Sequence, residues 1–229
     1  MSKLVFYSSK DTHGKKDATG AFVPEAKAFA RYHAILDEDV IGIDCTKTNK
    51  ASNRRAKVIQ ELSLREDLEL LAFFGHGWPS GIQFGIFKGH IERILDHVRA
   101  TDNLKVGLYA CLTAENEERD TSLKNVGPGT DGGFADTFRD EMVRHGITKG
   151  WVDGHKTAGH ATWNPNLVRF LCEDVDDRDY GAEGGFYLVE PRSTYWKKWC
   201  MALRRNTQNL RYSFILKTEL LLKSELEGM

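Results

Sequence analysis

Two apolar blocks in the middle of the chain, each ending on a reactive side chain, constrain the fold more than any other feature. One block covers residues 68–77, Leu-Glu-Leu-Leu-Ala-Phe-Phe-Gly-His-Gly, and brings His76 to its end between two glycines. The other covers residues 105–111, Lys-Val-Gly-Leu-Tyr-Ala-Cys, and ends on Cys111. Each block has the length and the apolar character of a buried β-strand. We therefore expect two strands that each deliver one reactive group.

The segment between the two blocks has the pattern of a helix. Its apolar side chains recur at the spacing of one helix face, at Ile91, Ile94, Leu95 and Val98. Strand, helix and strand in this order predict a βαβ unit whose two strands are parallel in one sheet. Parallel strands end at the same edge of a sheet, where α/β proteins build their sites. The sequence therefore predicts that His76 and Cys111 lie side by side.

The rest of the chain predicts more elements of the same kind. Strands are expected at residues 3–8, 40–44, 147–152 and 185–190, with a small hairpin or loop over residues 78–87. Helices are expected from Pro24, over residues 50–62, over Phe134, Phe138 and Met142, and, after Pro165, over Leu167, Val168 and Leu171. A His-rich loop is expected from Asp153 onward.

These elements predict an α/β fold with a mostly parallel sheet of about six strands and helices on both faces. The length of 229 residues suits a single sizeable core. We expect that core in residues 1–191, and a helical appendage packed on the same domain in residues 192–229, where the pattern turns helical.

Charge and cysteine usage exclude several classes of function. The formal net charge is −1, so no general attraction to nucleic acid or to a membrane surface is expected. The start of the chain does not resemble a signal peptide, and no apolar run approaches the ~20 residues of a membrane span. The cysteines are widely spaced, at Cys45, Cys111, Cys172 and Cys200. This spacing argues against a zinc site or a disulfide scaffold and favours reduced thiols in the cytoplasm.

The pairing of a histidine with a cysteine indicates nucleophilic catalysis. A free thiol has a pKa of about 8.5 and becomes a strong nucleophile when a neighbouring histidine takes its proton. The glycines beside His76 would let a substrate carbonyl approach the backbone, and the N–H of Gly77 could stabilise a developing oxyanion. We expect this chemistry to need no cofactor and no metal.

Both motifs match one known family. The runs 73–77 (Phe-Phe-Gly-His-Gly) and 108–113 (Leu-Tyr-Ala-Cys-Leu-Thr) resemble the caspase-like cysteine peptidases, and most of all the bacterial CHAT and caspase-like proteases. The segments 132–138 and 150–153 also fall where that fold has a helix and a strand, so the resemblance covers roughly residues 1–190. It implies a three-layer caspase-like sandwich and a thiol protease with a Cys111–His76 dyad.

The resemblance also implies a substrate pocket. Its positions in this sequence are Asp11, Tyr109 and Asp153. Two carboxylates without a nearby arginine would favour Arg or Lys before the cleaved bond, although Tyr109 replaces the acidic residue that metacaspases carry there. The alternative is that both acids are solvated loop residues.

The resemblance further implies a loop that is cut during activation. Residues 112–133 occupy its place, with Arg119 and Lys124 as candidate cleavage points. Partners implied in the same way are a protein or peptide substrate and a regulatory protein.

Two other classes of function stay open. One is a catalytically silent caspase-like scaffold for protein interactions, and the other is an α/β protein that binds a small molecule at the same sheet edge. A metal site at His145, His155 and His160 is disfavoured because nothing completes its ligand shell. The basic stretch after Arg192 is read as a solvated helix face rather than as a nucleic-acid site.

Overall fold

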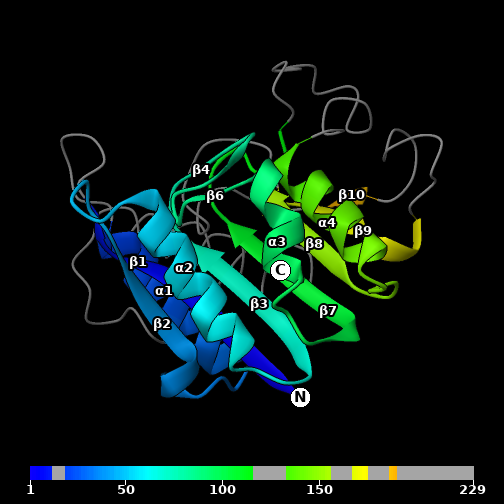
Figure 1. Cartoon of the computed structure of the whole chain (residues 1–229), viewed down its shortest axis with the longest axis horizontal. Coiled ribbons are helices and arrows are strands. Elements are labelled where there is room, and N and C mark those ends of the chain that lie inside the picture. The colour runs from blue at the N-terminus through cyan, green and yellow to red at the C-terminus, as the bar shows by residue number, and fades with distance from the viewer. Residues whose placement is uncertain (12–18, 116–132, 156–166, 175–185, 190–229) are drawn as a thin grey trace, which may run out of the picture.

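A computed structural model describes residues 1–11, 19–115, 133–155, 167–174 and 186–189 of the chain (Figure 1). A seven-stranded sheet forms its centre, in the order β10-β9-β8-β7-β3-β1-β2. The strands are β1 (Ser2–Asp11), β2 (Val40–Cys45), β3 (Leu68–Phe74), β7 (Ala100–Tyr109), β8 (Trp151–His155), β9 (Leu167–Leu171) and β10 (Phe186–Val189). The expected apolar blocks are thus β3 and β7, adjacent at the middle of the sheet.

Most of the sheet is parallel. β2, β1, β3, β7 and β8 pair in parallel, whereas β9 is antiparallel to both β8 and β10. The predicted α/β class with a mostly parallel sheet is therefore confirmed, with one strand more than expected. A second, three-stranded sheet of β4 (Gly77–Trp78), β5 (Gly81–Ile82) and β6 (Ile86–Phe87) follows directly after β3, where a small hairpin was expected.

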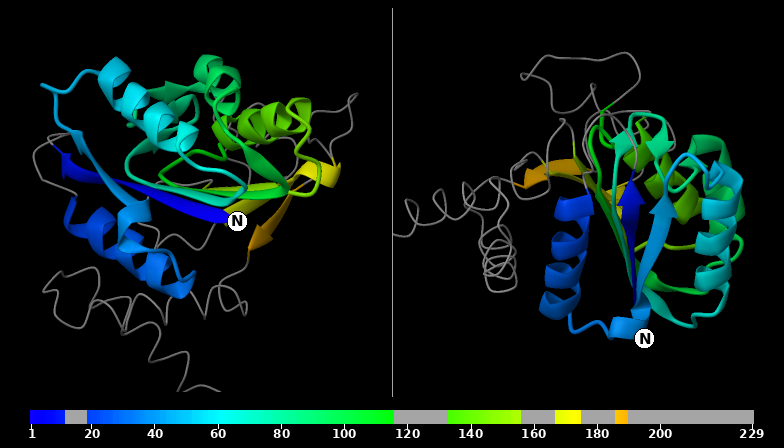
Figure 2. Two further views of the ribbon diagram at one scale, coloured as in Figure 1. Left: turned by 60° about the horizontal axis from the view of Figure 1, so that its bottom comes forward. Right: turned by 90° about the vertical axis from the view of Figure 1, so that its left-hand side faces the viewer.

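Helices cover both faces of the large sheet. α1 (Thr19–Tyr32) lies on one face, and α2 (Ala51–Ser63), α3 (Ile91–Leu95) and α4 (Phe134–Arg144) lie on the other (Figure 2). Short 3-10 helices connect the elements, at η1 (Asp37–Asp39), η2 (Lys88–His90) and η3 (Cys172–Asp174).

Side chains that alternate along each strand divide the apolar core into two parts. Leu71, Phe73 and Leu108 face the layer of α2, α3 and α4. Leu70, Phe74 and Tyr109 belong instead to the smaller cluster under α1. Side chains at alternate positions along a strand therefore pack on opposite faces of the sheet.

Two sequence predictions at the β8 side of the sheet are wrong. The strand expected at residues 147–152 lies later, because Gly146 has a φ of 81° and ends α4 before Ile147 packs into the core ahead of β8. The loop expected from Asp153 is therefore partly strand. The segment expected as a helix over Leu167 to Leu171 is the strand β9, paired antiparallel to β8. The appendage expected at residues 192–229 lies outside the described residues.

α4 is held against β9 by a buried charge cluster. The guanidinium of Arg139 is fully buried and donates to Asp136 at 2.6 Å and to Asp140 at 2.7 Å. It also donates to the carbonyl of Leu171 on β9 at 3.3 Å. The two carboxylates pair with the buried cation, as such burial requires. Within the described part of the chain, no helix has the length and apolarity to cross a bilayer.

Candidate active site

The register of β3 and β7 aligns the two reactive residues. Phe74 pairs with Tyr109 at the end of the parallel ladder. His76 follows Phe74 by two residues, and Cys111 follows Tyr109 by two residues. Neighbouring strands are about 4.8 Å apart, so the segments leave the sheet side by side at the same level.

Direct contact between the two segments is recorded at Gly77. A Cβ atom at this position would lie 2.7 Å from the carbonyl oxygen of Cys111 and 2.7 Å from the Cβ of Ala110. The backbone after β3 therefore lies directly on the backbone that carries Cys111, and only glycine allows this approach. This contact links the histidine segment directly to the backbone of the cysteine.

The imidazole of His76 is held by a carboxylate. Its Nε2 lies 2.8 Å from Oδ2 of Asp11, the last residue of β1. The side chain of Asp11 has no exposed surface, whereas that of His76 is 26% exposed. An ionised carboxylate only accepts hydrogen bonds, so Nε2 carries a proton, and in the neutral ring the acceptor nitrogen is then Nδ1.

This geometry changes the interpretation of Asp11. The alternative of a solvated loop acid is wrong, because the residue is buried at the end of a strand. The role implied by the resemblance, a substrate pocket, competes with the bond to His76. In the structure the carboxylate orients the histidine.

Two further residues hold His76, and neither was expected from the sequence. Oε1 of Gln83 accepts from the backbone N–H of His76 at 2.5 Å, and the backbone N–H of Gln83 donates to the carbonyl of His76 at 3.0 Å. Phe22 of α1 contacts the imidazole edge-on, with ring centroids 5.2 Å apart. Gly75 leaves room for this arrangement, since a Cβ there would lie 2.9 Å from Oε1 of Gln83.

The same hairpin orients the amide of Gly77. Because Gln83 bonds to the carbonyl of His76, Gly77 and Ile82 form a non-hydrogen-bonded pair of the antiparallel ladder. The N–H of Gly77 therefore points away from β5. A donor at Gly77 requires an N–H that the hairpin ladder does not use, and this pairing meets that condition.

The chain turns sharply directly after Cys111. Leu112 has a φ of 58°, a conformation that non-glycine residues seldom adopt and that often occurs at functional sites. Thr113 anchors the turn, since its hydroxyl donates to the carbonyl of Ala110 at 3.1 Å and accepts from the N–H of His155 at 3.2 Å. The end of β8 thus fixes the backbone that presents Cys111.

Cys111 differs from the other cysteines that the structure describes. It is partly exposed, whereas Cys45 and Cys172 are buried. Burial raises the pKa of Cys45 to about 11 and that of Cys172 to about 12. Both buried thiols are therefore protonated at neutral pH and inert. Cys200 lies outside the described residues.

The remaining substrate-binding candidates, Tyr109 and Asp153, lie within the strands β7 and β8. Tyr109 stacks on Phe74, with centroids 4.6 Å apart. Asp153 accepts two hydrogen bonds from Arg169, at 2.7 and 2.9 Å. The assumption that no arginine lies near these acids is therefore wrong. The expected preference for Arg or Lys loses its physical support, because Asp11 and Asp153 are both already paired.

Several expected features lie elsewhere. Arg119 and Lys124 fall within residues 116–132 and His160 within residues 156–166, so all three lie outside the described part of the chain. His155 is buried at the end of β8, near Tyr109. His145 lies at the end of α4, where it bonds to Asp96. Among the described residues, no three acidic, histidine or cysteine side chains come together as a metal site.

Comparisons with known proteins do not identify a function for this chain. No family model, no curated protein and no solved structure matches the chain. The caspase-like resemblance thus rests on the sequence alone, chiefly on the two motifs at His76 and Cys111. The function must be argued from the contacts that surround them.

Proposed function

We propose that the protein is a cysteine endopeptidase of the caspase-like kind, with Cys111 as nucleophile and His76 as general base. The observation that carries this proposal is the contact of Gly77 with the carbonyl of Cys111, at the end of two parallel strands in register. The buried carboxylate of Asp11 adds a third member that orients the imidazole. Nucleophile, base and orienting acid then come from β7, β3 and β1.

The first half of the reaction acylates the enzyme. Nδ1 of His76 takes the proton of the Cys111 thiol, and the thiolate sulfur attacks the carbonyl carbon of the scissile peptide. The carbonyl π electrons move to the oxygen, which becomes an oxyanion. Collapse of this intermediate breaks the C–N bond, and the imidazolium of His76 gives its proton to the leaving amine. The product is a thioester on Cys111.

The second half restores the thiol. His76 removes a proton from a water molecule, whose oxygen attacks the thioester carbonyl. The C–S bond breaks, the carboxylic acid leaves, and the sulfur regains its proton from His76. The negative charge of Asp11 favours the imidazolium that forms in both halves, and the bond to Nε2 keeps Nδ1 available as the base.

The backbone around His76 supports the oxyanion. The N–H of Gly77 points away from β5, and the N–H of Cys111 is the second donor that this proposal assigns. Loss of one such donor typically lowers the rate by about 10²–10³. The two bonds from Gln83 to the backbone of His76 therefore matter for catalysis as well as for local order.

A catalytically silent scaffold is the main alternative. A scaffold has no need for a partly exposed thiol and an oriented imidazole at the ends of two adjacent parallel strands, whereas a peptidase does. Regulation by a partner protein and a location in the cytoplasm follow only from the resemblance and from the cysteine pattern. Neither the partner nor the location is evidence for the proposed peptidase activity.

A peptide-library digest tests the proposed activity. The wild-type protein is expected to cleave a subset of peptides, while Cys111→Ala is expected to cleave none. Cys45→Ala serves as the matched control, since its thiol is buried and its pKa is raised by burial. Cleavage that survives Cys111→Ala would refute the assignment.

Self-processing is tested by incubation of the pure protein followed by a denaturing gel. Cleavage within residues 112–133, at Arg119 or Lys124, is expected in the wild type and absent in Cys111→Ala. A single intact band under all activating conditions would refute self-processing without touching the peptidase proposal.

A further inference from the structure

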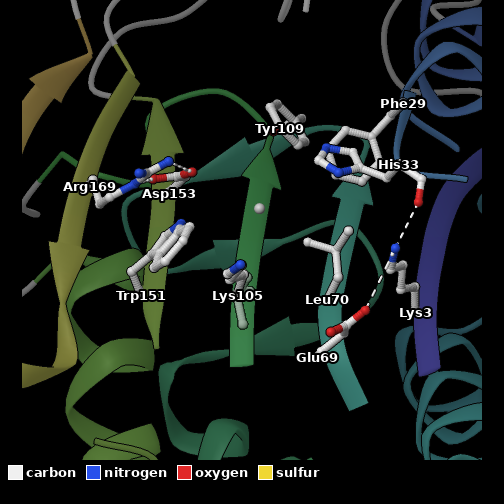
Figure 3. A pocket seen from close by; sticks show the side chains of 12 residues that line it. Lys3, Phe29, His33, Glu69, Leu70, Lys105, Tyr109, Trp151, Asp153 and Arg169 are labelled. Atoms are coloured by element: carbon white, nitrogen blue, oxygen red, sulfur yellow. Dashed lines mark hydrogen bonds and ion pairs between the residues drawn. The ribbon is translucent and has the colours of Figure 1, made fainter. Parts of the chain in front are cut away.

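A pocket of about 280 Å³ lies on the α1 side of the sheet, inward from the catalytic edge (Figure 3). Its floor is β7, where Lys105, Gly107 and Tyr109 share one face of the strand. Gly107 has no side chain to fill the space between the other two. Figure 3 shows Trp151 on one side of β7 and Leu70 on the other, as opposite walls.

The charges around the pocket do not cancel. Lys3 pairs with Glu69 at 3.6 Å, and Arg169 pairs with Asp153 at 2.7 Å. Lys105 is different, because no carboxylate of the described residues lies within ion-pair distance of its ammonium. Its recorded contact is with the Trp151 ring, 4.8 Å from the ring centroid. With the two pairs neutral, the pocket carries one positive charge.

His33 adds no further charge at neutral pH. Its ring lies at the end of α1 on the wall of the pocket. Burial, and then the positive charges of Lys3 and Lys105, lower the pKa of His33 to about 4. The excess of positive charge therefore belongs to Lys105.

Aromatic rings form much of the remaining wall. Trp151 lies under the guanidinium of Arg169, 4.4 Å from ring centroid to Cζ. Tyr109 closes the end toward the catalytic edge, and Phe29 of α1 contacts it at 5.3 Å between centroids. A volume of about 280 Å³ is at the lower end for small-molecule pockets, too small for a dinucleotide.

We propose that this pocket binds a small aromatic carboxylate, with the anionic group on Lys105 and the ring between Trp151 and Leu70. Because Lys105 is the one cation among the described pocket residues without a paired carboxylate, we expect the ligand to carry one negative charge. The aromatic and aliphatic walls suit a ligand with a single ring. The binding site precedes Cys111 by two to six residues along β7 and does not use the thiol. Tyr109 and Asp153 line this pocket as well as belonging to the substrate positions that the resemblance implies, but the proposed ligand contacts at Lys105, Trp151 and Leu70 do not depend on peptidase activity.

Isothermal titration calorimetry of the full chain with phenylacetate tests the proposal. Phenylacetamide, which has the same shape but no charge, is the matched ligand control. We expect phenylacetate to bind and phenylacetamide to bind at least roughly tenfold more weakly, because a charge-assisted hydrogen bond is lost. Added salt should weaken the binding of phenylacetate alone.

Variants locate the site. Lys105→Met should abolish the charge preference, and Lys105→Arg should keep it. Lys57→Met is the control, since Lys57 lies on α2 at the opposite face of the sheet and pairs with Glu61. Cys111→Ala should bind phenylacetate as the wild type does, even if the protein proves not to be a peptidase.

Three results would overturn the proposal. The first is no heat of binding with phenylacetate up to its solubility limit. The second is equal affinity for phenylacetamide. The third is unchanged binding by a Lys105→Met protein whose unfolding transition matches that of the wild type.

Discussion

Oδ2 of Asp11 lies 2.8 Å from Nε2 of His76, although Asp11 ends β1, His76 follows β3, and the two are separated by 65 positions in the chain. The carboxylate is buried and the imidazole is partly exposed, so a buried group fixes one ring nitrogen while part of the ring remains accessible to solvent. With Asp11 included, the proposed pair of Cys111 and His76 becomes a proposed set of three groups. This relationship gives the first prediction.

Asp11→Asn should lower the rate of any Cys111-dependent reaction by roughly 10² or more. The amide of Asn donates to Nε2, so the ring proton moves to Nδ1, where the base is needed. Peptide cleavage and the alkylation of Cys111 at neutral pH both measure this effect. Asp44→Asn, at the end of the neighbouring strand β2, is the control and should leave both rates unchanged. Equal rates for Asp11→Asn and wild type would show that Asp11 does not orient the base.

Gly77→Ala should inactivate the site with little change in global fold. The new Cβ would lie 2.7 Å from the carbonyl oxygen of Cys111, so the two segments must separate. Gly89→Ala is the matched control, because a Cβ at that position meets no atom within 4 Å. The readouts are peptide cleavage and the far-ultraviolet circular dichroism spectrum. Full activity of Gly77→Ala would contradict the proposed geometry.

Gln83→Ala should slow the reaction and destabilise the protein by about 1–3 kcal/mol, the usual effect of an unsatisfied buried donor. The variant leaves the N–H of His76 without its acceptor. Gln83→Glu keeps an acceptor oxygen and should restore much of the rate, which a purely structural role would not require. Urea unfolding and cleavage assays separate the two effects. No rescue by Gln83→Glu would count against a positioning role.

The stability of the protein should fall as the pH falls from about 6.5 to about 4 because of His33. In the folded state its pKa is lowered to about 4, whereas an unfolded histidine titrates near 6.5. Between these values the unfolded chain binds the extra proton, so acid favours unfolding, with a slope of at most about 1.4 kcal/mol per pH unit.

Urea unfolding at several pH values measures this dependence. His33→Gln should flatten the curve across the window, while His97→Gln, at an exposed position after α3, should not. An unchanged curve for His33→Gln would mean that His33 does not titrate as described.

The fold could be predicted at its centre because the signals there are local. The β3 and β7 blocks are continuous apolar runs. The helical spacing of apolar residues between them predicts a βαβ unit. β9 could not be predicted in the same way. Leu-Val-Arg-Phe-Leu suits a helix or a strand, and its pairing with β8 decides the outcome. Ile147 belongs to the core yet precedes β8, so its apolar character gave the wrong boundary.

Of the candidate site, only the residues at the ends of these two apolar blocks could be predicted from the sequence pattern. His76 and Cys111 stand out because each ends an apolar run. Asp11 follows a polar stretch of β1, and nothing in its neighbourhood signals a bond to a residue 65 positions away. Gln83 lies in a short hairpin whose sequence carries no mark of contact with His76. The pairing of Asp153 with Arg169 depends on β9, which the sequence did not predict.

The central claim is that His76 activates Cys111, and the pH dependence of Cys111 alkylation tests it most directly. Iodoacetamide labelling, resolved cysteine by cysteine with mass spectrometry, gives the rate for wild type and for His76→Ala. The account predicts that His76→Ala slows the labelling of Cys111 at pH 7, and that the difference vanishes well above about pH 8.5, where a thiol ionises without help. Equal rates at pH 7 for the two proteins, or labelling of Cys111 no faster than that of the buried Cys45 and Cys172, would contradict it.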